Sequence, residues 1–150
     1  MTLPASFPLS MSQIATELGL SLPLSLSHAW VEALANKTGL PVKFSDLLGK
    51  TGRFDGNITC SGGTSPLLGN PFFNSTLDQL SFLGGTVGLT YSGIAPSYTG
   101  NIKLINNTNS VSAVLAFNGA IGFTGWYNSS PPANIVNQNG TNNYTILPSI

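Results

Sequence analysis

The spacing of apolar residues along the chain changes near residue 53. Before that point, three short units share one order: proline, aliphatic, polar, large apolar, serine, polar, apolar. They occupy residues 8–14, 23–29 and 41–47. Beyond it, apolar and polar residues alternate in short runs, as in half-buried strands. The pattern predicts a mainly β fold: short helices in an N-terminal segment, residues 1–53, followed by an antiparallel β-sandwich or jelly-roll-like domain, residues 54–150.

Each of the three units predicts the start of a short helix. Proline fixes φ and favours an extended approach, and the serine four residues later is suited to cap the helix N-terminus. A glycine that follows each unit can end the helix in the left-handed conformation. We therefore expect helices at residues 13–18 and 28 to about 37 and a single turn from Asp46, which end at Gly19, Gly39 and Gly49.

The predicted helices are short enough to be marginally stable alone. We expect packing on each other or on a neighbouring protein to hold them, so the segment would dock onto a partner. The candidate contacts are its large apolar residues at helical spacing: Met11, Ile14, Leu26, Trp30, Phe44 and Leu47.

The second part of the chain contains several strand signals. Alternation predicts strands at residues 86–91, 101–105, 111–117 and 144–147, whereas residues 77–82 fit a helix or a strand. The pair Asn118-Gly119 favours a two-residue hairpin. That hairpin would place Phe117 opposite Ala120, Leu115 opposite Gly122, Ala113 opposite Thr124 and Val111 opposite Trp126, with a Gly/Asn-rich loop at 137–143 before the last strand.

Charge is scarce and unevenly placed. Only 7% of the residues are charged, against about a quarter in ordinary soluble domains. After residue 55 the chain carries only Asp78 and Lys103, and the net charge is zero. Such a composition lacks the basic patch that nucleic acids or anionic membranes attract, and no apolar run approaches the ~20 residues of a membrane span. We expect no nucleic-acid binding and no membrane insertion, and a surface suited to contact copies of the same chain.

Residues that carry catalysis are few and scattered. His28 and Cys60 are the single histidine and cysteine, and Asp55 and Asp78 are the carboxylates beyond residue 53. Nothing in their spacing brings them together, because acid–base and metal sites need convergent partners. The sequence predicts no enzyme, no cofactor and no metal site, with Cys60 and His28 in structural roles.

Aromatic residues offer one further candidate surface. Tyr91, Tyr98 and Tyr144 are possible contacts to a receptor or glycan, together with Trp126 and Tyr127. For Trp126, packing inside the core is the alternative, given its place in the predicted hairpin.

Three runs of the N-terminal third resemble a short module in virion proteins of tailed bacteriophages. The runs are residues 8–19 and 22–39 and, above all, Val42-Lys43-Phe44-Ser45-Asp46-Leu47-Leu48-Gly49-Lys50. In that module, a start of serine, apolar, serine, variable and isoleucine leads to a phrase ending in serine, aspartate, aromatic or leucine, apolar, glycine and lysine. The resemblance covers about the first third of the chain.

The resemblance implies a virion structural protein, a tail or tail-tip component. Residues 1–53 would then dock it to other virion proteins, and the protein would be located in the virion after assembly in the host cytoplasm. By analogy with phage fibres and tips we expect a homo-oligomer, a trimer by preference. Two alternatives stay open: a tail module that binds a host-cell surface receptor or glycan, and a capsid decoration protein.

Overall fold

The computed structural model describes residues 2–119 and 125–150. In these ranges the helices are α1 (Met11–Leu18), α2 (Ala29–Ala35) and the short 3₁₀ helix η1 (Phe44–Leu47). The strands are β1 (Phe54–Cys60), β2 (Pro71–Phe72), β3 (Ser75–Leu83), β4 (Thr86–Ser92), β5 (Ile102–Asn106), β6 (Val111–Asn118), β7 (Gly125–Asn128) and β8 (Gly140–Pro148).

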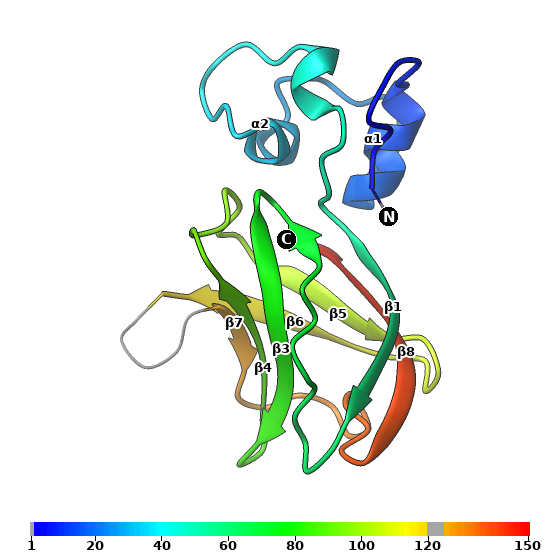
Figure 1. The fold of residues 1–150 in the computed structure, drawn as a ribbon, viewed down its shortest axis with the longest axis vertical. Helices are drawn as coiled ribbons and strands as arrows, with labels where there is room; N and C mark the ends of the chain where they lie inside the picture. The colour runs from blue at the N-terminus through cyan, green and yellow to red at the C-terminus, as the bar shows by residue number, and fades with distance from the viewer. Residues whose placement is uncertain (1, 120–124) are drawn as a thin grey trace.

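The strands form one antiparallel sheet in the order β1-β8-β5-β6-β7-β4-β3-β2. Figure 1 shows this sheet coiled into a nearly closed, barrel-like shape. The prediction of a mainly β, antiparallel fold is confirmed. The sandwich or jelly-roll form is not confirmed, because β6 pairs with both β5 and β7 and so joins all the strands into a single sheet.

The segment between β1 and β2 covers most of the remaining gap in the barrel. It runs along the outer edge of β3, where the Ser65 N–H donates to the Leu80 carbonyl and the Gly69 N–H donates to the Leu77 carbonyl, at 2.9 and 3.0 Å. A groove of about 430 Å³ lies between β1 and residues 66–70 of this segment. β1 therefore pairs with β8 on one side and borders this groove on the other.

The helices begin and end near the predicted positions, with different caps. α1 begins two residues early, because Ser10 rather than Ser12 caps it and Gln13 completes a reciprocal capping box; Gly19 ends it in the left-handed conformation as predicted. For α2, the Nδ1 atom of His28 accepts from the Trp30 N–H, so the histidine itself is the cap. α2 ends at Asn36, three residues before the predicted Gly39, since Asn36 already adopts the left-handed conformation (φ 57°).

The helices form a layer over one end of the sheet (Figure 1). Ile14, Leu34 and Leu47 of this layer belong to the same buried cluster as Leu80 and Trp126 of the sheet. The sequence left two ways to hold the helices, packing on each other or on a neighbouring protein. The structure shows that their apolar stripes pack on the molecule's own sheet. The boundary near residue 53 separates helices from strands but does not separate two cores.

The sheet confirms several strands and corrects the predicted hairpin. Strands form at all four predicted positions, and residues 77–82 lie in strand β3. Phe117 lies opposite Trp126, and Val111 pairs with Asn106 of β5 rather than with Trp126. The observed register of β6 and β7 therefore differs from the one that a turn at Asn118-Gly119 would set. The other predicted partners, Ala120, Gly122 and Thr124, lie outside the described residues. The last strand starts at Gly140, inside the predicted loop 137–143.

Candidate functional site

The residues predicted to contact a partner face the interior of the fold. Ile14 and Leu47 are fully buried. The other four are half-buried and pack against the core: Met11, Leu26, Trp30 and Phe44. Ile14 and Leu47 are therefore wrong as docking residues, because their side chains are already covered by the chain itself.

A different set of apolar residues in the same segment is exposed to solvent. Phe7, Leu22 and Leu40 are 60, 56 and 60% exposed. Each stands immediately before the proline that opens one of the three repeated units. The repeat thus presents one large exposed side chain per unit. The sequence analysis does not include these three residues, because it starts each unit at the proline and considers only the apolar residues at helical spacing. The large apolar residue before each proline is the feature of the repeat that could have identified them.

The tyrosines predicted to face a receptor are mostly internal. Tyr98 and Tyr144 are 6 and 0% exposed, so the prediction is wrong for these two residues. The Tyr98 hydroxyl lies 2.7 Å from the Asn101 carbonyl oxygen and 3.0 Å from the Ser149 carbonyl oxygen and shares its single proton between them. The Tyr144 hydroxyl accepts from the Asn137 N–H at 3.2 Å. Burial raises the pKa of both phenols. Both rings are structural members of the core.

Tyr91 and Trp126 belong to an aromatic cluster at the junction of β4, β6 and β7. Tyr91 is half-buried and stacks on Phe117, with ring centroids 6.2 Å apart. Trp126 is fully buried and its Nε1–H donates to the Gly100 carbonyl at 2.9 Å. Core packing is thus confirmed for Trp126, and the aromatic platform does not form.

The outer face of β6 and β7 is apolar and exposed. Val114 and Tyr127 are 41 and 36% exposed, and Ala116, which pairs with Tyr127, is exposed as well. The inner face is buried in the barrel, whereas this one points outward.

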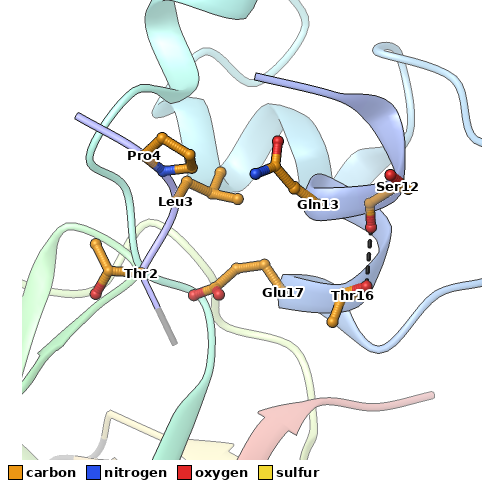
Figure 2. A pocket seen from close by; sticks show the side chains of 7 residues that line it. All are labelled: Thr2, Leu3, Pro4, Ser12, Gln13, Thr16 and Glu17. Atoms are coloured by element: carbon orange, nitrogen blue, oxygen red, sulfur yellow. Dashed lines mark hydrogen bonds between the residues drawn. The ribbon is translucent and has the colours of Figure 1, made fainter. Parts of the chain in front are cut away.

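Residues 2–4 and helix α1 line a pocket of about 300 Å³ (Figure 2). Its lining is mainly apolar and includes one ionisable side chain, Glu17, among the residues that the structure describes: Thr2, Leu3, Pro4, Ser12, Gln13, Thr16 and Glu17. Figure 2 shows Glu17 reaching from α1 toward Thr2, with Leu3 and Pro4 across the pocket from Gln13.

Glu17 is completely buried, and one of its two carboxylate oxygens has hydrogen-bond donors in the described part of the chain. Its Oε1 accepts from the backbone N–H groups of Gly52 and Arg53 at 2.7 and 3.0 Å. Its Oε2 is buried and has no hydrogen-bond partner in the described part of the chain. Burial raises the pKa of this carboxyl, whereas the two backbone N–H groups and the positive charges of the N-terminal amino group and of Arg53 lower it. No local pattern indicates this site, because the two donors lie more than thirty residues further along the chain.

Other titratable groups in the described ranges form separate ion pairs. Arg53 pairs with Asp55 at 2.6 Å and Lys37 pairs with Asp46 at 3.0 Å, while Asp78 accepts from the Thr90 hydroxyl at 3.4 Å. Burial raises the pKa of the Cys60 thiol, which is nearly fully buried. No group of three or more His, Cys, Asp or Glu side chains in the described ranges could hold a metal ion. No helix in the described ranges has the length and apolarity to cross a membrane.

Comparisons with models of protein families, with curated proteins and with solved structures find no match to this chain.

Proposed function

We propose that the chain is a non-enzymatic structural protein of a bacteriophage virion, a tail or tail-tip component that docks through its N-terminal segment. The observation that carries the proposal is the exposure of Phe7, Leu22 and Leu40 at equivalent positions of the three units. The resemblance of residues 8–50 to a virion module supports the same assignment. The proposed partner is another virion protein.

Exposed side chains of this kind are well suited to anchor an interface. Burying one large apolar side chain stabilises a contact by about 1.5–3 kcal/mol, and a few such anchors supply most of the affinity of a typical interface. All three lie in the N-terminal segment that contains α1, α2 and η1. Figure 1 shows these helices at one end of the molecule and strand connections at the opposite end. In this arrangement the layer contacts the particle and the barrel projects away from it.

Incorporation into particles tests the docking surface directly. We expect the triple variant Phe7→Ser, Leu22→Ser, Leu40→Ser to remain folded and to be lost from purified particles. The matched control is Leu67→Ser with Leu83→Ser, since these residues are 71 and 59% exposed but lie in the stranded part, on the β1–β2 connection and at the end of β3. Normal incorporation of the triple variant, or equal loss of the control, would refute docking through this layer. The copy number per particle separates a tail component, present in few copies, from a capsid decoration protein, present in many.

We further propose that the protein forms a homo-oligomer, a trimer by preference, through the outer face of β6 and β7. The exposed Val114, Ala116 and Tyr127 support this contact, and Lys103, one of the two charged residues after residue 55, lies opposite Val114 on the neighbouring strand β5. Sedimentation equilibrium should give a multiple of the chain mass for the wild type and a monomer for Val114→Lys. A wild-type monomer at all concentrations contradicts the proposal.

A receptor- or glycan-binding module of the tail is the other candidate. Tyr98 and Tyr144 do not support it, because they are buried, and only Tyr91 among the three predicted tyrosines is part-exposed. Host adsorption by particles that carry Tyr91→Ala tests whether Tyr91 contacts a receptor. A reduced adsorption rate with normal incorporation would favour the receptor-binding role.

A further inference from the structure

A hollow of about 560 Å³ lies between α2 and the connection from β4 to β5. Trp30 and Ala33 line it from the helix, and Tyr98, Thr99 and Asn101 line it from the connection. Its volume falls within the range of about 300–1,000 Å³ that is typical of small-molecule sites. None of the lining side chains in the described ranges carries a charge, so the hollow suits a neutral ligand.

The connection from β4 to β5 is held in place by the rest of the fold. The Ser97 N–H donates to the Phe73 carbonyl at 2.9 Å. The Gly100 carbonyl accepts from the Nε1–H of the buried Trp126, also at 2.9 Å. The backbone on both sides of Thr99 is therefore fixed before any ligand binds, which lowers the entropy that binding would cost.

Three polar side chains at this hollow are available to a ligand. Thr38, Thr99 and Asn101 line the hollow, are exposed or half-buried, and have no side-chain hydrogen bond within residues 2–119 and 125–150. By contrast, other amides of the sheet bond one another, as Asn107 does with Asn143 at 2.8 Å. Hydroxyl and amide groups can both donate and accept. The hollow thus offers donors and acceptors that the protein itself does not use.

Trp30 supplies an apolar surface beside these polar groups. Its ring is half-buried and makes edge-type contacts with His28 and Tyr98, with ring centroids 5.5 and 6.1 Å apart. These two contacts fix the orientation of the indole. Its Nε1–H has no partner in the described part of the chain, so the same side chain offers a further donor. A fixed aromatic ring next to unused polar groups suits a ligand that is itself part apolar and part polar.

We propose that this hollow binds a neutral saccharide, with one sugar ring against Trp30 and its hydroxyl groups bonded to Thr38, Thr99 and Asn101. A sugar ring presents apolar C–H groups together with hydroxyls that donate and accept, so it matches both parts of the lining. A purely apolar ligand fits less well, because it would cover the three polar side chains without giving them partners.

This inference gives the receptor- or glycan-binding candidate a site centred on Trp30, and it rests on that candidate only for its biological role. The docking residues Phe7, Leu22 and Leu40 do not line the hollow. Saccharide binding by the purified protein and incorporation into particles are separate measurements, so either proposal can fail without the other.

Titration of the isotope-labelled intact chain with methyl glycosides, followed by two-dimensional NMR, tests the site. The probes are the methyl glycosides of glucose, galactose, mannose, N-acetylglucosamine and N-acetylgalactosamine. With at least one of them we expect saturable shifts of the Trp30 indole N–H and the Asn101 side-chain amide. The Asn107 side-chain amide, beyond the opposite end of β5, should stay unshifted. Glycerol and cyclohexanol at equal concentrations should give no saturable shift.

A double variant tests the polar contacts. Thr38→Val with Thr99→Val keeps the shape of both side chains and should weaken binding at least about fivefold, the effect of losing two hydrogen bonds between neutral groups. The matched control is Thr59→Val with Thr86→Val, on β1 and β4, which do not line the hollow and should leave binding unchanged.

The proposal is overturned if none of the five glycosides shifts the Trp30 signal saturably, or if the folded double variant binds as tightly as the wild type. Equal binding of cyclohexanol also overturns it, since the hollow would then select apolar ligands. Should the double variant fail to fold, Asn101→Leu provides the second test, because the Asn101 side chain has no hydrogen bond to lose within the described residues. Unchanged affinity of folded Asn101→Leu would refute the site.

Discussion

Glu17 and Asp55 show how position sets the behaviour of a carboxyl group. Glu17 is fully buried, and burial raises its pKa above the ordinary value despite two backbone donors. Asp55 lies at the surface of β1. Partial burial acts to raise its pKa, but hydrogen bonds from Arg53 and Thr145 and the charge of Arg53 together lower it. The two groups should therefore change the stability of the fold with pH in opposite directions.

The pH dependence of unfolding checks the buried group. Since folded Glu17 holds its proton more tightly than in the unfolded chain, the wild type should lose stability as pH rises from the ordinary value of 4.5 through the raised folded pKa. Glu17→Gln removes this loss, so the wild-type free energy of unfolding should fall relative to the variant over that interval. Urea denaturation across a pH series measures the difference. Glu32→Gln controls for the change in net charge, and a difference that stays constant with pH contradicts the prediction.

Trp126 gives a second test at this scale. Trp126→Phe removes the Nε1–H that donates to the Gly100 carbonyl and leaves a gap in the core. The free energy of unfolding should fall by about 1–3 kcal/mol, the cost of an unsatisfied buried acceptor. Trp30→Phe is the matched change at a half-buried position and should cost less. Equal losses in urea denaturation would contradict this assignment.

At the scale of elements, β4 and β7 approach each other closely at Gly125. A Cβ atom there would lie 2.1 Å from the Leu89 carbonyl oxygen and 2.9 Å from the Thr90 Cα. Both neighbours are backbone atoms of β4, so neither can move aside without disturbing the ladder. Only a residue without a side chain allows Trp126 to reach its buried position at this pairing.

Gly125→Ala should therefore be strongly destabilising, by more than about 2 kcal/mol. Gly39→Ala provides the comparison. Gly39 also has a positive φ, of 73°, but no atom lies within 4 Å of its added Cβ, so only the backbone strain of about 1–2 kcal/mol applies. Urea denaturation of the two variants separates the close contact from the strain. Similar losses would show that the two strands can separate to admit a methyl group.

Local patterns predicted most elements but not their pairing. Alternation located β4 and β6, and the serine-rich starts located α1 and α2, because these signals involve neighbouring residues. The predicted hairpin register is wrong because it depends on the turn signal at Asn118-Gly119 alone. The observed register instead places Trp126, which is fully buried, opposite Phe117. Tyr144 was treated as exposed, although its two-residue spacing from the core residue Ile146 places both on one face of β8.

The candidate site depended on contacts that no local pattern contains. Glu17 lies on a helix whose sequence indicates only amphipathicity, and its donors follow η1 much further along the chain. The repeat itself could have indicated Phe7, Leu22 and Leu40, because each precedes the proline of one unit. Their exposure, however, depends on which side of each unit faces the sheet, and that is decided by tertiary packing.

At the scale of the whole molecule, the helices and the barrel stabilise one another. Besides the shared core, the Asn74 side-chain amide donates to the Leu34 carbonyl at 3.1 Å, and the Ser97 hydroxyl donates to the Ala33 carbonyl at 2.6 Å. These bonds satisfy the carboxyl end of α2 with groups from the stranded part. The helical layer is thus part of the folding unit.

Removal of the layer should unfold the barrel. We expect the fragment 54–150 to lack a cooperative urea transition and to give a poorly dispersed NMR spectrum, because Phe73 and Tyr98, which the layer covers, become exposed. The intact chain is the control. A fragment with dispersed signals and a cooperative transition would instead establish the stranded part as an independent domain.

The pairing of β1 with β8 determines when the barrel can close during synthesis. Residues 54–60 leave the ribosome well before their hydrogen-bonding partners, residues 140–146. Until those emerge, the first strand of the sheet has an unpaired edge on both sides. Pairings this distant in sequence slow folding, since a long loop must close before any bond forms. Nascent chains of this protein should therefore acquire their hairpins early and their complete barrel only at the last strand.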